Sequence, residues 1–95
     1  MNIDFVFYKG KHKIDIKLKK FINNCKKMFS NCKDIYEIKF INVMTNEIRD
    51  MSLMFNKCTN LNNLDINNFK TNKVEDMEGM FQECSNLTNL NFKFK

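Results

Sequence analysis

Proline and tryptophan are absent from this 95-residue chain, and glycine occurs only twice. With 43% hydrophobic and 28% charged residues, the composition is that of one small globular domain rather than a disordered segment. No run of about 18 apolar residues occurs, which excludes a membrane-spanning helix. The start, Met1 to Phe5, lacks the basic region and the long apolar stretch of a signal peptide, so the sequence as written predicts a cytoplasmic location.

Groups that carry catalysis or bind metals are also scarce. The chain has one histidine, His12, in a segment expected to form a solvated turn, and it has no Cys-x-x-Cys pair. No Ser–His–acid set, catalytic carboxylate pair or Gly-rich phosphate loop is visible. We therefore expect no enzyme, no cofactor and no catalytic, cofactor-binding or metal-binding residue.

Positive charge is concentrated at one end of the chain. Residues 1–35 carry nine Lys against three Asp (9 − 3 = +6), and residues 36–95 carry seven Lys or Arg against eight Asp or Glu (7 − 8 = −1). Clustered lysines attract phosphates without sequence preference, which gives the alternative function, a cytosolic basic protein that binds nucleic acid or acidic surfaces. The segment has no Arg and no recognised binding motif, which argues against nucleic acid. The lysines concerned are Lys9, Lys11, Lys13, Lys17, Lys19, Lys20, Lys26 and Lys27.

Aligned against itself, the chain repeats every 26 residues. Phe29, Phe55 and Phe81 are 26 apart, and each directly follows a Met. Such a period is typical of stacked units, each of which cannot bury its apolar side alone. We predict that residues 26 apart lie directly above one another. In the second copy the recurring apolar positions are Ile48, Met51, Met54, Phe55, Cys58, Leu61, Leu64 and Ile66.

Each unit has two halves with different apolar spacing. From Ile48 to Cys58 the apolar residues are spaced 3, 3, 1 and 3 apart, which predicts one stripe of a helix of about three turns. Thr45 and Thr71 precede two of these stripes, where a side-chain oxygen can cap free amides. Leu64 and Ile66 then fall on one face of a short strand. The pattern predicts helix–strand units that stack into a parallel sheet.

The N-terminal residues do not follow the full repeat. Alternating apolar residues on either side of Gly10 predict a β-hairpin over residues 2–18, and Ile14 lies one period before Phe40. The predicted fold is α/β, a solenoid with an N-terminal hairpin cap and a last strand over residues 91–95. The single domain 1–95 divides into the cap, 1–20, and three repeats, 21–46, 47–72 and 73–95.

The four cysteines follow the same repeat. Three of them share one repeat position and the fourth replaces a Met, so their spacing fits buried apolar residues stacked in a column. Stacked side chains point the same way, whereas zinc needs four converging ligands and a disulfide needs facing Cβ atoms. We expect free thiols at Cys25, Cys32, Cys58 and Cys84.

The second unit closely resembles a known repeat. Residues 51–77, MSLMFNKCTNLNNLDINNFKTNKVEDM, resemble the BspA-like leucine-rich repeat, M-x-x-M-F-x-x-C-x-x-L-x-x-L-D-L-x-x-F-x-T-x-x-V-x-D-M. The resemblance covers about residues 22–94, and the first unit departs from it at Ile38-Lys39-Phe40. It implies a right-handed solenoid and a place on secreted or surface-exposed proteins that function in adhesion or bind host proteins. It carries over no catalytic residues.

The surface expected to bind is the sheet face turned away from the predicted helices, because repeat stacks present such extended faces to partners. The nine side chains expected there are Glu37, Lys39, Ile41, Asn63, Asp65, Asn67, Asn89, Asn91 and Lys93. They are polar and mixed in charge, without an aromatic anchor, which argues against tight binding by three repeats alone.

The leading hypothesis from the sequence is a non-enzymatic module that binds another protein and is related to adhesins or is a fragment of a surface protein. The residues do not name that partner. The C-terminal edge strand offers unpaired N–H and C=O groups, so self-association through that edge is a further expectation.

Overall fold

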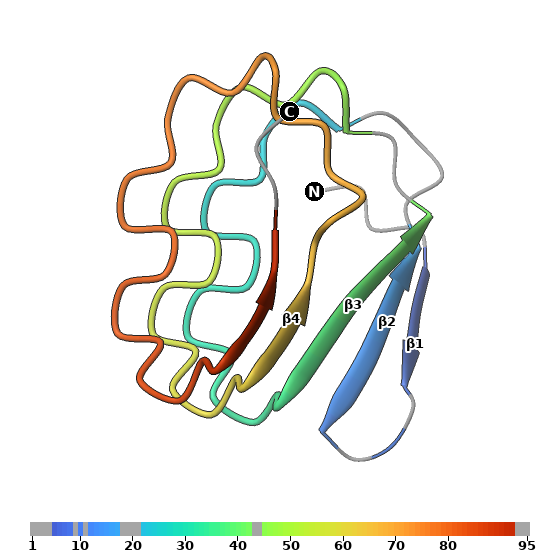
Figure 1. Cartoon of the computed structure of the whole chain (residues 1–95), viewed down its shortest axis with the longest axis vertical. Coiled ribbons are helices and arrows are strands. Elements are labelled where there is room, and N and C mark those ends of the chain that lie inside the picture. Colours follow the sequence, from blue (N-terminus) through green and yellow to red (C-terminus); the bar gives the residue numbers. More distant parts are fainter. Residues whose placement is uncertain (1–4, 9, 11, 18–21, 43–44, 93–95) are drawn as a thin grey trace.

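The computed structural model describes residues 5–8, 10, 12–17, 22–42 and 45–92. Its strands form one five-stranded sheet in the order β1-β2-β3-β4-β5 (Figure 1). β2 to β5 are parallel, and β1 pairs antiparallel with β2 as the predicted N-terminal hairpin. The bounds are Phe5–Tyr8 for β1, Lys13–Lys17 for β2, Glu37–Asn42 for β3, Asn63–Asp65 for β4 and Asn89–Asn91 for β5.

The sheet register follows the 26-residue period between the last three strands. Ile38 lies opposite Leu64, and Leu64 lies opposite Leu90. We refer to the described residues of 21–46, 47–72 and 73–95 as coil 1, coil 2 and coil 3. Each coil contributes one strand and returns to the sheet after a long turn-rich stretch (Figure 1).

The register of the first parallel pair differs from the sequence prediction. Ile14 pairs with Ile38 rather than with Phe40, an offset of 24 instead of 26. With this offset both Ile14 and Ile16 have apolar partners, whereas an offset of 26 would place Ile16 opposite Asn42. A shift of two residues keeps every side chain on its own face of the sheet, so burial decides between the two registers.

The predicted helices are wrong, because the described residues contain no helix. In their place are three turn segments, residues 25–32, 51–58 and 77–84, which Figure 1 shows as stacked meanders beside one another. In coil 2 the amides of Met54, Asn56 and Cys58 donate to the carbonyl three residues earlier, at 3.4, 3.2 and 3.1 Å. An α-helix would instead pair each amide with the carbonyl four residues earlier.

Four further amides of the turn segments in coils 1 and 2 bond to the next coil. Donor–acceptor distances from coil 2 to coil 3 are 2.8 to 3.0 Å. The four pairs are Met51 to Asp76, Leu53 to Glu78, Phe55 to Met80 and Lys57 to Gln82. The same four positions in coil 1 donate to coil 2. Backbone hydrogen bonds therefore join the coils on the turn side as well as on the sheet side.

Left-handed backbone explains why turns replace the helix. Each turn segment has two residues with positive φ, four positions apart, and a right-handed helix has none. Because the backbone turns sharply every four residues, the buried side chains of a turn segment are spaced 3 and 1 residues apart. The apolar stripe of a helix has the same spacings, so the sequence pattern does not distinguish the two structures. The positive-φ residues are Lys27 and Asn31, Leu53 and Lys57, and Gly79 and Glu83.

The core confirms the predicted stacking of residues 26 apart. The rings of Phe29 and Phe55 lie parallel at 5.7 Å, and those of Phe55 and Phe81 lie parallel at 5.9 Å. Phe40 packs edge-on against Phe69 at 4.8 Å between their centroids. All eight recurring apolar side chains of coil 2 are completely buried. Within the described part of the chain, no helix is long and apolar enough to cross a membrane.

Candidate interaction face

The outward face of the sheet carries most of the predicted binding residues. Ile38 and Phe40 of β3 are buried, so the alternate residues Glu37, Lys39 and Ile41 point away from the core. The same alternation turns Asn63 and Asp65 of β4, and Asn89 and Asn91 of β5, to that side. Lys93 lies outside the described residues. We call the seven described strand residues the sheet face: Glu37, Lys39, Ile41, Asn63, Asp65, Asn89 and Asn91.

Asn67, the remaining predicted binding residue, does not lie on a strand. It follows β4 in a turn, where its amide donates to the Asp65 carboxylate at 3.2 Å. Its side-chain oxygen is buried without a hydrogen-bond partner among the described residues. Asn67 therefore shapes the end of β4 more than it extends the sheet face.

The charges of the outward side chains compensate one another across the strands. Lys39 lies between Asp15 on β2 and Asp65 on β4, and Lys13 lies opposite Glu37. The Asn63 amide also donates to the Glu37 carboxylate at 3.0 Å. Outward positions of β2 to β4 hold Lys13, Lys17 and Lys39 against Asp15, Glu37 and Asp65, which gives 3 − 3 = 0.

Sequence reasoning missed an exposed aromatic group next to the start of β3. Tyr36, directly before β3, is 40% exposed, and its ring stacks on that of His12 with 4.3 Å between centroids. The Nδ1 atom of His12 lies 2.6 Å from the Asp34 carbonyl oxygen, which fixes the imidazole. The repeat alignment could have revealed this residue, because the positions equivalent to Tyr36 in coils 2 and 3 hold Asn62 and Thr88, which are not aromatic.

Only four of the eight lysines named for the alternative function lie among the described residues. Lys26 and Lys27 are exposed on the turn segment of coil 1, and Lys13 and Lys17 share β2 with Asp15. Lys9, Lys11, Lys19 and Lys20 lie outside the described residues. The described lysines therefore lie on two sides of the coil stack instead of forming one row.

The four cysteines are free thiols in stacked positions. The Cys58 thiol donates to the Phe29 carbonyl at 3.0 Å, and the Cys84 thiol donates to the Phe55 carbonyl at 3.0 Å. Burial raises the pKa of Cys25 and of Cys58 to about 12. Among the described residues, no three His, Cys, Asp or Glu side chains are grouped to hold a metal ion.

These thiols are expected to react slowly with Ellman's reagent in the folded protein at pH 8. The thiolate is the reactive form, and a pKa near 12 leaves Cys25 and Cys58 protonated about 10⁴-fold over the thiolate. Unfolding in guanidinium should release all four thiols at once, measured by absorbance. Rapid reaction of Cys58 without unfolding would contradict its burial in the stack.

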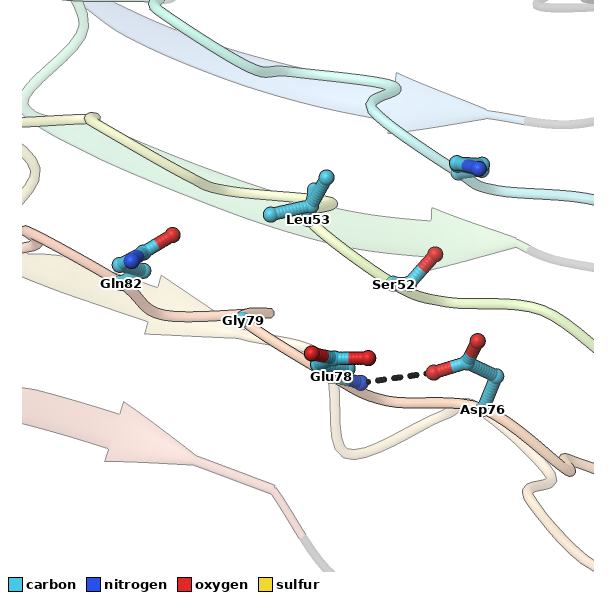
Figure 2. Close-up of a pocket in the computed structure, with 7 residues that line it drawn as sticks. Ser52, Leu53, Asp76, Glu78, Gly79 and Gln82 are labelled. Carbon is cyan, nitrogen blue, oxygen red and sulfur yellow. Dashed lines mark hydrogen bonds between the residues drawn. The ribbon is translucent and has the colours of Figure 1, made fainter.

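An open hollow of about 410 Å³ lies on the turn segments, away from the sheet face (Figure 2). The Asp76 carboxylate accepts the Glu78 amide at 2.9 Å, so this group already caps a turn. A Cβ at Gly79 would lie 2.7 Å from the Leu53 side chain, so glycine leaves space for Leu53. The lining residues are Lys26, Ser52, Leu53, Asp76, Glu78, Gly79 and Gln82. The residues that line the hollow therefore include groups that cap turns, and they do not form a set of converging reactive side chains.

The cap of Asp76 recurs in the other coils. Asp50 accepts the Ser52 hydroxyl at 2.6 Å and the Ser52 amide at 2.8 Å, and these bonds lower the pKa of Asp50. Because that pKa is lowered on folding, the carboxylate stabilises the fold at neutral pH, and this contribution is lost as the pH falls through the folded-state value. Asn24 makes the equivalent cap to the Lys26 amide at 2.8 Å without a charge.

A family model described as "Mycoplasma protein of unknown function, DUF285" matches residues 2–95. No curated protein and no solved structure matches the chain.

Proposed function

The chain belongs to the DUF285 family of Mycoplasma proteins, and from this membership and the stacked coils we propose that it is a non-enzymatic protein-interaction module. Within that family we assign it to the BspA-like class of leucine-rich-repeat solenoids. It binds another protein through the sheet face, and such a module serves adhesion when carried on a surface protein.

The observation that carries this proposal is the polar sheet face, together with an exposed aromatic residue directly before β3. Parallel strands present rows of side chains at fixed spacing, and Tyr36, held by His12, supplies the kind of anchor found in binding hot spots. Ile41, 41% exposed, adds an apolar contact on the same side. Such a combination of polar rows and a few large side chains suits a folded protein surface.

The balanced charge of the outward side chains favours a protein over a nucleic acid as the partner. Binding to a phosphate backbone needs an excess of Lys and Arg, whereas Lys39 here lies between two carboxylates. A non-enzymatic role is supported by His12, whose ring faces a backbone carbonyl and Tyr36 rather than a nucleophile.

Exchange of two charges on the sheet face tests the proposal. The double variant Lys39→Glu, Asp65→Lys keeps the net charge and the cross-strand pair but inverts the pattern seen by a partner. We expect partner affinity to fall at least about tenfold, roughly 1.4 kcal/mol. The urea midpoint of unfolding should also fall, because Lys39→Glu sets a carboxylate opposite Asp15 and Asp65→Lys removes the acceptor of the Asn67 amide. Affinity is therefore compared under conditions in which circular dichroism shows the variant to be folded. Proteins captured by the immobilised wild type would be identified first and then titrated against both variants by calorimetry.

The matched control exchanges charges on the turn segments. Lys57 and Glu83 are both exposed and 26 residues apart, so Lys57→Glu with Glu83→Lys changes as many charges away from the sheet face. This control should bind like the wild type. If the sheet-face variant also binds every partner unchanged, the face is wrongly assigned. Heparin retention that is lost when Lys19, Lys20, Lys26 and Lys27 become Gln would favour the alternative, a basic nucleic-acid-binding protein.

A further inference from the structure

Charge on the turn side of the stack changes sign from coil 1 to coil 3. We call the outer side of residues 26–31, 52–57 and 78–83 the turn face. The first stretch carries Lys26 and Lys27 (+2), the second carries Lys57 (+1), and the third carries Glu78 and Glu83 (−2). All five residues are exposed. The turn face therefore has a basic end on coil 1 and an acidic end on coil 3.

The two ends do not neutralise each other within the chain. Lys26 and Glu78 occupy equivalent positions two coils apart, about 10 Å, which is too far for an ion pair. No charge of the turn face takes part in an ion pair between described residues. Lys26 does act on Asp50, whose pKa is lowered first by the hydrogen bonds from Ser52 and then by this charge. Both ends are therefore open to the charges of a partner.

The turn face points sideways out of the stack. Coil 2 has a coil on either side, and its Lys57 is still exposed, so the stacking of coils does not cover this face. At the centre of the face, the apolar side chain of Leu53 is only half-buried and lies beside Gly79 of coil 3 (Figure 2). An apolar centre surrounded by charged groups is the usual layout of a protein–protein interface.

A second copy of the chain matches this charge pattern. When two turn faces meet about a two-fold axis along the turn segment of coil 2, coil 1 of each copy faces coil 3 of the other. Lys26 then faces Glu78 of the second copy, and the two Leu53 side chains meet on the axis. Lys57 lies diagonally across from Glu83 of the second copy.

Other occupants fit the turn face less well. A parallel arrangement of two copies would set Lys26 against Lys26 and Glu78 against Glu78. A partner with charge of one sign, such as a nucleic acid, would be attracted by one end of the face and repelled by the other. Only a partner whose charge also changes sign along its surface neutralises both ends.

We propose that the turn face is a self-complementary interface through which two copies of the chain dimerise. Three coils about 4.8 Å apart make a narrow face, so the dimer belongs to the weak, transient class that buries less than about 1,200 Å². The turn segments lie across the core from the strands, so the dimer presents its two sheet faces on opposite outer sides (Figure 1). If the sheet face binds as proposed above, the dimer joins two partner molecules.

Sedimentation equilibrium of the full chain tests the dimer. No partner of the sheet face is present, so the outcome does not depend on the function proposed for that face. The mean mass of the wild type should rise with concentration from one chain towards two. Salt at about 0.5 M should weaken the dimer at least about fivefold, because it screens exposed charges.

Two single variants and their combination test which charges meet. Lys26→Glu and Glu78→Lys each place like charges at both contacts of the dimer, and each should weaken it at least about tenfold. The double variant restores opposite charges and the net charge, so it should dimerise like the wild type. An equimolar mixture of the single variants should recover for the same reason. Lys70→Glu is the control, because Lys70 is exposed outside the turn face and its replacement makes the same change in net charge as Lys26→Glu.

Circular dichroism would verify that each variant is folded, and the remaining outcomes overturn the proposal. A wild type that stays monomeric at every concentration would exclude the dimer. An equal loss with Lys70→Glu would show that only net charge matters, and a dimer unaffected by either single variant would lie elsewhere, for example at the edge of β5. No recovery in the double variant would mean that Lys26 does not face Glu78. A monomer retained on heparin through Lys26 would assign the basic end to an acidic partner.

Discussion

Replacing Phe55 with alanine is expected to lower the free energy of unfolding by about 3–5 kcal/mol. The ring is completely buried between Phe29 and Phe81, parallel to both. Its loss removes apolar contacts with two coils at once and leaves a cavity that the backbone bonds between coils prevent from closing. A domain this small has only a few kcal/mol of stability, so much of the population should unfold.

The measurement for Phe55→Ala is urea unfolding followed by circular dichroism, since the chain has no tryptophan. Phe81→Ala is the matched control, because Phe81 belongs to the same column but is half-buried and has a stacking neighbour on one side only. Its expected loss is about half or less. Equal losses at the two positions would contradict the placement of Phe55 in the middle of a stack.

Insertion of a second copy of residues 47–72 after Asn72 is expected to raise the stability of the chain. The added coil would lie between coils 2 and 3 with every column continued, and stacked repeats gain both intrinsic and interface free energy. At about 0.05–0.15 kcal/mol per residue, 26 residues contribute roughly 1–4 kcal/mol. A higher urea midpoint and a steeper dependence on urea would be measured.

The control for this insertion is a half copy, residues 60–72, at the same site. Thirteen residues would place a turn segment over a strand, so coil 3 would lose both its hydrogen bonds to coil 2 and its apolar columns. We expect the half copy to destabilise the chain or prevent folding. If both insertions were tolerated equally, the period of 26 would have no structural meaning.

The repeat period and the sheet could be predicted because the side chains that must be buried are apolar and recur at fixed spacing in the sequence. Leu64 and Leu90 fall 26 apart and pair in the sheet as their spacing requires. The hairpin pairing of β1 with β2 followed from alternation. The register of Ile14 could not be obtained from the period alone, because the two neighbouring apolar pairs together decide it.

The helices were predicted wrongly because apolar spacing does not report where backbone amides bond. Leu53 and Lys57 have left-handed backbone, which neither residue type favours, and their amides bond to coil 3. That acceptor exists only once the coils have stacked. Local sequence therefore favours a helix that tertiary hydrogen bonding replaces.

The outward placement of the strand side chains could be predicted from the sequence, but the ring pair of Tyr36 and His12 could not. The alternation that buries Ile38 and Phe40 also assigns Glu37, Lys39 and Ile41 to the sheet face. The ring pair of Tyr36 and His12 joins residues 24 apart, a separation outside the period of 26. The irregular register at the N-terminal end of the sheet brings them together, and no repeat column encodes that register.

Side chains at equivalent positions also bond along the stack on the turn side. The Ser30 hydroxyl donates to the Asn56 side-chain oxygen at 3.2 Å, and the Asn56 amide donates to Gln82 at 3.0 Å. Together with the backbone bonds between turn segments, these side-chain hydrogen bonds stabilise the stack on its turn side.

The most direct test of the stacked coils is a nuclear Overhauser experiment with methyl-labelled isoleucine and leucine. The structure predicts cross-peaks from Ile38 to Leu64 and from Leu64 to Leu90, across adjacent parallel strands. Absence of both cross-peaks, with contacts only between residues three or four apart in sequence, would contradict the coil stack.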